Sequence, residues 1–222
     1  MPPVTMKTFT ASTARPLPVL VLADTSGSMS VDGKIDALNT ALADMVDAFS
    51  AEDDGRARIH VGIITFGGTA QLHQALCDAS KVALPPMGAS GMTPMGAAFD
   101  LVRAIVEDTD QIPSRAYTPA IVLVSDGQPN DDWEPALARL LGSERAKKAQ
   151  RFALGIGSDA DPVVLRRFLD KPDGKVYAAH DARQIREFFR WVTMSVTSRS
   201  RSATPNVSVV DNFPATDLDE LL

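Results

Sequence analysis

Oxygen-bearing side chains fall at three places along the chain where they could act together. In the segment DTSGSMS that begins at Asp24, a carboxylate and the hydroxyls of Ser26 and Ser28 occupy alternate positions and can converge on one point. Thr93 precedes an amphipathic stretch, and Asp126 follows a short apolar run. A ligand set made only of oxygen suits a hard divalent cation, Mg²⁺ before any transition metal. The five residues therefore predict a metal centre assembled from three segments.

The elements that must position these residues alternate between short apolar runs and amphipathic stretches. Six apolar runs are expected to be strands: residues 18–23, 59–66, 70–76, 120–125, 151–156 and 175–178. The stretches expected to be helices are residues 35–49, 97–106, 134–149, a short one from Asp161, and 183–198. Such alternation predicts an α/β doubly wound fold, with a mostly parallel six-stranded sheet and helices on both faces. Gly67-Gly68 is a hairpin signal, which makes the third strand an antiparallel edge.

Length and composition bound the class of protein. A chain of 222 residues is enough for one ordinary domain, and 45% hydrophobic with 23% charged residues excludes disorder throughout. The net charge of −6 argues against nucleic-acid binding, which needs a basic excess. Cys77 is the single cysteine, so no internal disulfide can form. With no visible secretory signal and no apolar run of about 20 residues, we expect a cytoplasmic protein without membrane contact.

The two ends differ in composition from the middle of the chain. Residues 1–16 hold three prolines and little apolar periodicity, and we expect a flexible lead-in. Residues 17–197 carry the strand and helix pattern of the domain. Residues 198–222 begin with linker composition and end in an acidic tail that contains a few large apolar residues. We expect this tail to be disordered, or to be a short docking segment that folds on a partner.

The order of the three oxygen-bearing segments resembles the von Willebrand factor A domain. That family builds its metal-ion-dependent adhesion site (MIDAS) from an Asp-x-Ser-x-Ser segment, a Thr before a helix, and an Asp-Gly after an apolar strand. All five positions match here, and the resemblance covers roughly residues 17–197. It implies that Ser26 and Ser28 bind the metal directly and Thr93 directly or through water. Asp24 and Asp126 would act through water or by orienting the hydroxyls.

This resemblance implies metal-dependent protein binding and no enzymatic turnover. A cation held mainly by neutral hydroxyls, Mg²⁺ or alternatively Mn²⁺ or Ca²⁺, keeps charge that an acidic residue of a protein partner can satisfy. The segments DTSGSMS, Ile64-Thr-Phe66 and SDGQPNDDW look most like the bacterial tellurium-resistance (TerY-like) branch. That branch implies an intracellular adaptor or regulator in a stress or defence system, with a Ser/Thr kinase and a phosphatase among its partners. Met92 departs from the family's usual Gly-Gly-Thr.

Three alternatives of function stay open at this stage. They are an extracellular adhesion module of the same fold, an accessory subunit of an ATPase-driven complex, and a Mg²⁺-dependent phosphohydrolase. The last is disfavoured because Ser26 stands where a phosphatase that uses Asp24 as nucleophile would carry a second acid.

Other motifs in the sequence give weaker indications of function. Gly33-Lys34 ends a poor match to a P-loop, because Ile35 stands where that loop needs Ser or Thr. Gly155-Ile-Gly157 is interpreted as a tight turn after a strand, and not as a dinucleotide fingerprint. The three histidines show no zinc spacing. Of the acidic pair Asp131-Asp132, we expect Asp132 to cap the helix that follows.

Overall fold

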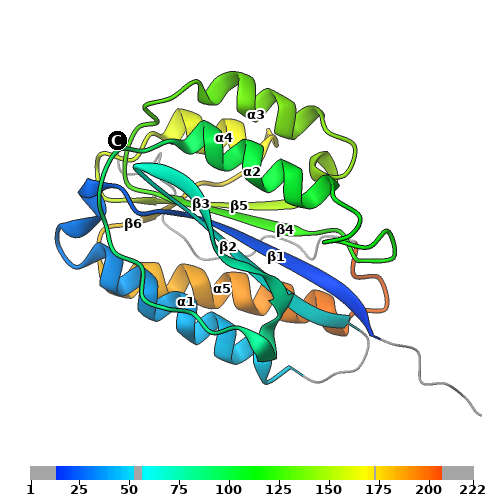
Figure 1. The fold of residues 1–222 in the computed structure, drawn as a ribbon. Helices are drawn as coiled ribbons and strands as arrows, with labels where there is room; N and C mark the ends of the chain where they lie inside the picture. The colour runs from blue at the N-terminus through cyan, green and yellow to red at the C-terminus, as the bar shows by residue number, and fades with distance from the viewer. Residues whose placement is uncertain (1–13, 53–56, 173, 207–222) are drawn as a thin grey trace, which may run out of the picture.

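The sheet is the centre of the molecule and has helices on both faces (Figure 1). A computed structural model describes residues 14–52, 57–172 and 174–206. Within these ranges the six strands are β1 (Arg15–Asp24), β2 (Ala57–Gly67), β3 (Thr69–Asp78), β4 (Ala120–Ser125), β5 (Gln150–Ile156) and β6 (Tyr177–Ala179). Their order across the sheet is β3-β2-β1-β4-β5-β6, and only β3 runs antiparallel to its neighbour. The predicted doubly wound α/β class is confirmed.

Two helical layers cover the sheet, as the ribbon in Figure 1 shows. The helices are α1 (Lys34–Ser50), α2 (Met95–Glu107), α3 (Trp133–Gly142), α4 (Pro162–Leu169) and α5 (Ala182–Arg201). Three 3-10 turns lie in connections between strands and helices: η1 (Gly27–Ser30), η2 (Ala79–Lys81) and η3 (Ala146–Lys148). Helices α1 and α5 pack on one face, and α2, α3 and α4 pack on the other. No described helix has the length and apolar character that crossing a membrane requires.

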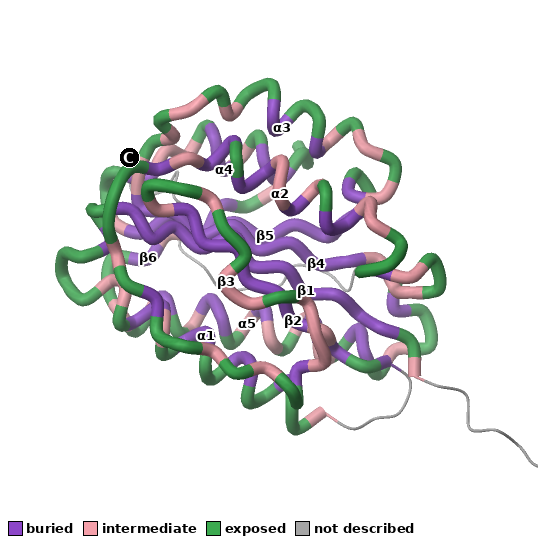
Figure 2. Tube along the Cα trace, viewed as in Figure 1, coloured by how far each residue is buried: buried purple, intermediate pink, exposed green. Residues whose placement is uncertain are grey.

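Alternate residues of the central strands supply the two cores. In β1, Val19 and Val21 face the α1 and α5 layer, whereas Leu20 and Leu22 face the α2 layer. All four side chains are fully buried, and Figure 2 shows β1, β4 and β5 as the buried centre of the trace. Burial on both faces explains why these strands are continuous apolar runs in the sequence. The resulting rigid sheet fixes the positions of the loops at its carboxyl edge.

The helix predicted over residues 134–149 is shorter than expected. Helix α3 ends at Gly142, and the separate turn η3 follows. The carboxylate of Glu107 explains the interruption, because its Oε1 accepts the backbone N–H groups of Arg145 and Ala146 at 2.8 and 3.0 Å. Those groups therefore bond to α2 instead of continuing an α-helical ladder.

The last helix is longer than expected. The serine and arginine run assigned to a linker from Ser198 belongs to α5 up to Arg201. Arg199 is 2% exposed, and its guanidinium donates to Pro205 O, Gln150 Oε1 and Thr118 O. Burial lowers the pKa of this guanidinium to about 10. The chain beyond Asn206 and before Ala14, which holds most of the predicted tail and lead-in, lies outside the described residues.

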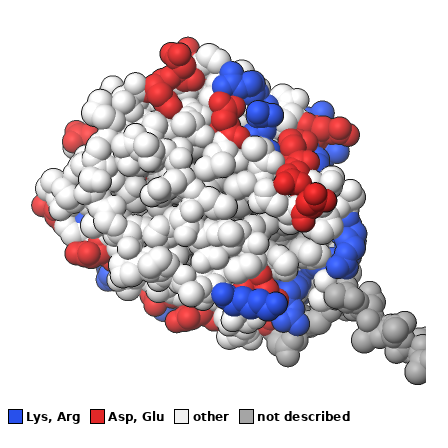
Figure 3. All heavy atoms as spheres, in the orientation of Figure 1, with Lys and Arg blue, Asp and Glu red and all other residues white. Residues whose placement is uncertain are grey.

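Charged side chains lie around the rim of the face drawn in Figure 3. Acidic and basic groups are interspersed there, and the centre of that face is largely uncharged. The net charge of −6 is therefore not gathered into one acidic surface on this face.

Candidate metal centre

The candidate site lies where the winding of the sheet reverses. From β1 the chain moves outward to β2 and β3, and it then returns to β4 on the other side of β1. Asp24 is the last residue of β1, and Asp126 follows the last residue of β4. Both carboxylates are fully buried. Parallel strands that diverge in this way leave a crevice at their carboxyl ends, which is where such sheets bind ligands.

Asp24 shapes the first loop. Its Oδ1 accepts the backbone N–H of Ser26 at 2.8 Å, and its Oδ2 accepts the hydroxyl of Ser125 at 2.5 Å. Burial raises the pKa of the Asp24 carboxyl above its usual 3.8, against the hydrogen bonds from Ser125 and Ser26 that lower it, and the charge of Asp126 adds to the rise. With both oxygens engaged, Asp24 ties the loop to β4 and orients Ser26.

The two loop hydroxyls form a chain of oxygens with the second carboxylate. Ser26 Oγ lies 3.0 Å from Ser28 Oγ, and Ser28 Oγ donates to Asp126 Oδ1 at 2.7 Å. Ser26 precedes the turn η1 in extended backbone, and Ser28 lies within that turn. Ser26 is buried and Ser28 is exposed. Ser28, the middle member of the chain of oxygens, is therefore its exposed point, between the buried residues Ser26 and Asp126.

Backbone hydrogen bonds seat the loop that carries Thr93. Gly27 N–H donates to Gly91 O at 2.9 Å, Gly68 N–H donates to Met92 O at 2.8 Å, and Ser90 N–H donates to a carbonyl of the first loop at 2.8 Å. Gly91 has a φ of +77°, and a Cβ there would lie 2.6 Å from Gly68 Cα. A glycine is therefore required for the close approach between this loop and the β2–β3 hairpin.

Thr93 shares the side of the site on which Ser28 lies. A Cβ placed on Gly127 would be 3.8 Å from Ser28 Oγ and 3.9 Å from Thr93 Oγ1. Thr93 is 8% exposed, and its carbonyl accepts the N–H groups of Met95 and Asn130. The structure thus brings all five predicted residues to one end of the sheet.

Asp131 fastens the second and third segments to each other. Its two carboxylate oxygens accept the N–H groups of Gly96 and Ala97 at 2.9 Å each, in the first turn of α2. The expected capping by Asp132 is wrong, because that residue precedes α3 but its side chain makes no capping hydrogen bond. The carboxylate of the neighbouring Asp131 is the one that caps a helix, and that helix is α2 instead of α3.

Lys34 is the functional-site residue that sequence reasoning missed. Its Nζ lies 2.7 Å from Asp126 Oδ2, and its side chain is 17% exposed. In the sequence, Gly33-Lys34 was considered only as the end of a poor P-loop match. The lysine's place at the start of the helix after the first loop was the available signal.

The donor set fits a small hard cation. An octahedron with metal–oxygen distances of about 2.0–2.1 Å has neighbouring oxygens about 2.9 Å apart. The oxygens of Ser26 and Ser28, at 3.0 Å, lie close to that spacing. Among residues 14–52, 57–172 and 174–206, no group of three or more His, Cys, Asp or Glu side chains is placed so that it could hold a metal ion by itself. A metal in this region would therefore rely on hydroxyls.

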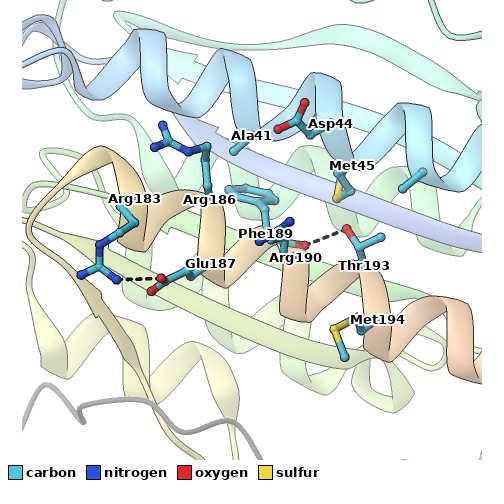
Figure 4. A pocket seen from close by; sticks show the side chains of 11 residues that line it. Ala41, Asp44, Met45, Arg183, Arg186, Glu187, Phe189, Arg190, Thr193 and Met194 are labelled. Atoms are coloured by element: carbon cyan, nitrogen blue, oxygen red, sulfur yellow. Dashed lines mark hydrogen bonds and ion pairs between the residues drawn. The ribbon is translucent and has the colours of Figure 1, made fainter.

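A hollow of about 480 Å³ opens beside the site. Ser28, Asp126 and Gly127 form one wall, and the loop of residues 158–162 forms the other. A larger hollow of about 920 Å³ lies elsewhere, between α1 and α5, where Met45, Phe189 and Met194 line a groove with arginines of α5 (Figure 4). Only the smaller hollow contains residues of the candidate site.

Comparison with known proteins gives a family, a sequence relative and a set of similar structures. The family model for the von Willebrand factor type A domain matches residues 19–191. The 60 kDa subunit of magnesium chelatase from Rhodobacter capsulatus is 31% identical over 149 residues, which is 64% of this chain and 25% of that protein. The chain therefore spans about a quarter of the length of this relative.

Solved structures share the fold. A von Willebrand factor type A protein from Catenulispora acidiphila superposes with a TM-score of 0.63 at 24% identity, over 85% of this chain and 43% of that one. Proximal thread matrix protein 1 from the mussel byssus, in a structure with a zinc-occupied MIDAS motif, gives 0.62 at 15% identity, over 83% and 48%. With the family model matching most of its length, the chain belongs to the von Willebrand factor type A domain family.

Proposed function

We propose that the protein is a metal-dependent protein-binding module whose metal is held by Ser26, Ser28 and Thr93, with Asp24 and Asp126 in support. The observation that carries the proposal is the chain of oxygens from Ser26 through Ser28 to Asp126, at the switch point of the sheet. A divalent cation at that place would supply an electrophilic point for a carboxylate of the partner.

The residues of the chain prepare that point in distinct ways. Asp24 holds the first loop to β4 through Ser26 and Ser125, so the loop does not have to reorganise. Ser28, being exposed, faces the direction from which a partner arrives. Because the hydroxyls are neutral, they leave a cation partly unsatisfied, and an Asp or Glu of a partner can complete the coordination. We propose Mg²⁺ as the ion, with Mn²⁺ or Ca²⁺ as the alternatives.

The hydrogen bonds of Asp24 favour a binding function over a catalytic one at this site. A phosphohydrolase that used Asp24 as nucleophile would need one of its oxygens directed at the substrate. Both oxygens instead accept hydrogen bonds within the protein, one from Ser26 and one from Ser125.

The biological setting of the module is the finer part of the proposal. The loop motifs support an intracellular bacterial adaptor or regulator of the tellurium-resistance type, with a Ser/Thr kinase and a phosphatase as partners. Similarity to the magnesium-chelatase subunit supports a second candidate, an accessory subunit of a larger assembly. Affinity capture from the native host with and without EDTA separates the two by the partner that is recovered.

Calorimetry with Mg²⁺ and Mn²⁺ tests the metal site itself. Wild type is compared with a Ser26→Ala/Ser28→Ala variant and with Ser30→Ala, whose hydroxyl donates to Gly27 O and not to the site. We expect wild type and Ser30→Ala to bind alike and the double variant to lose binding. Equal titration of all three proteins, or no binding by wild type even with its partner present, would contradict the proposal.

A further inference from the structure

The position of Lys34 is unusual for a lysine. It is the first residue of α1, where the helix dipole disfavours a positive charge. Its side chain nevertheless lies mostly buried and reaches across to the end of β4, where its ammonium meets Asp126 Oδ2 at 2.7 Å. The carboxylate of Asp126 therefore compensates for a location that is otherwise unfavourable.

The turn after β5 leaves space for the side chain of Lys34. A Cβ on Gly157, in the turn after β5, would lie 3.6 Å from Lys34 Nζ and 3.8 Å from Cε. The lysine thus passes against a residue without a side chain.

Asp126 divides its two oxygens between the lysine and the candidate metal site. Oδ1 accepts the hydroxyl of Ser28, whereas Oδ2 accepts the lysine. The carboxylate is fully buried, and an unpaired buried charge is costly, so the ammonium of Lys34 supplies a positive charge that Asp126 needs. A divalent cation bound to Ser28 and supported by Asp126 would also neutralise this carboxylate. The cation and the ammonium of Lys34 would then be two positive charges next to one negative charge.

We propose that Lys34 is a resident counter-cation of the metal centre, which neutralises Asp126 in the metal-free protein and weakens metal binding by competing for that carboxylate. This inference rests on the proposed function. It explains how the fold tolerates a buried carboxylate before metal arrives. It also makes metal affinity adjustable at a residue that is not itself a ligand.

Mn²⁺ affinity, read from the electron paramagnetic resonance signal of the free ion, tests the competition. The full chain is compared as wild type, Lys34→Met, Lys34→Arg, and Lys81→Met as a control in the exposed turn η2. We expect Lys34→Met to bind Mn²⁺ about tenfold more tightly, because one positive charge near a dication is removed. Lys34→Arg and Lys81→Met are expected to bind Mn²⁺ with affinities within about threefold of wild type.

Thermal unfolding gives a second readout that does not depend on that signal. Without metal, Lys34→Met is expected to melt several degrees below wild type, since Asp126 is left unpaired. With saturating Mg²⁺ the difference is expected to close, because the ion replaces the lost charge and stabilises the folded state that binds it.

Two results would overturn the inference in distinguishable ways. If wild type binds Mn²⁺ and Lys34→Met binds it equally or more weakly, Lys34 only positions Asp126, and the proposed function survives. If neither wild type nor any variant binds Mn²⁺ or Mg²⁺, the proposed function fails and the competition fails with it.

Discussion

Gly91 is the residue on which the seating of the Thr93 loop depends most. Its φ of +77° belongs to the region that favours glycine, and a Cβ there would lie 2.6 and 2.7 Å from the Cα and N of Gly68. The obstructing atoms are backbone and belong to the β2–β3 hairpin, so they cannot rotate away. A Gly91→Ala substitution must therefore move either the hairpin or the loop that carries Thr93.

The expected loss in the free energy of unfolding of Gly91→Ala has two parts. Substitutions at two other glycines allow the two parts to be measured separately. Left-handed backbone costs a residue with a side chain about 1–2 kcal/mol. Relieving the contact with the hairpin adds about 1–3 kcal/mol, so the free energy of unfolding should fall by roughly 2–5 kcal/mol. Gly33→Ala has a φ of +68° with nothing within 4 Å, and should show only the first part. Gly88→Ala, with open space around it and no positive φ, should change little.

Urea unfolding of the three variants, followed by circular dichroism, measures these differences. We also expect Gly91→Ala to weaken Mg²⁺ binding, because Thr93 moves with its loop, while Gly88→Ala binds as wild type does. The reasoning is refuted if Gly91→Ala matches Gly88→Ala in stability, since neither strain nor contact would then be present.

Three further substitutions test other contacts of the fold. Asp131→Ala removes the acceptor for two N–H groups of α2 and should cost about 1 kcal/mol in urea unfolding, with weaker Mg²⁺ binding in calorimetry; unchanged values of both would contradict its role. Arg199→Met leaves three acceptors without their donor and should lower the free energy of unfolding by about 2–4 kcal/mol. A loss below about 0.5 kcal/mol would contradict this, because it would mean that water replaces the hydrogen bonds of the guanidinium. Burial alone would raise the pKa of Glu107, but two backbone N–H groups hold it below its usual 4.5, so its contribution to stability is present above pH 4.5 and is lost as pH falls through the folded-state pKa. Glu107→Gln should therefore be less stable than wild type by under about 1 kcal/mol at pH 7, with a difference that shrinks in unfolding experiments as the pH is lowered below 4.5; a difference that does not change with pH would contradict the charge argument.

The fold was predictable because its strongest signals are local. Strands such as β4, in which every residue is buried, appear in the sequence as continuous apolar runs, and the doubly wound class follows from their alternation with helices. The candidate ligands were predictable for the same reason. Asp24 and Asp126 stand at strand ends, and parallel strands bring such ends to one edge. Their binding of metal stays a prediction.

The features that escaped prediction depend on partners far away in the sequence. Lys34 and Asp126 are separated by 92 positions, and the place of the lysine after the first loop does not indicate which carboxylate it pairs with. Asp131 accepts the N–H of Gly96, 35 residues earlier in the first turn of α2, whereas the local pattern favours its neighbour as the cap of the next helix. The end of α3 is likewise set by Glu107, a residue of α2. Such contacts follow from how the helices pack, which periodicity does not encode.

Paramagnetic broadening by Mn²⁺ tests the location of the metal most directly. Backbone amide signals of the full chain are recorded while Mn²⁺ is added at less than one equivalent. The account predicts that the signals of Ser26, Ser28 and Gly127 broaden first, while that of Ala149, at the opposite end of the sheet, stays sharp. Uniform broadening, or selective broadening away from the end of β1 and β4, would contradict the account.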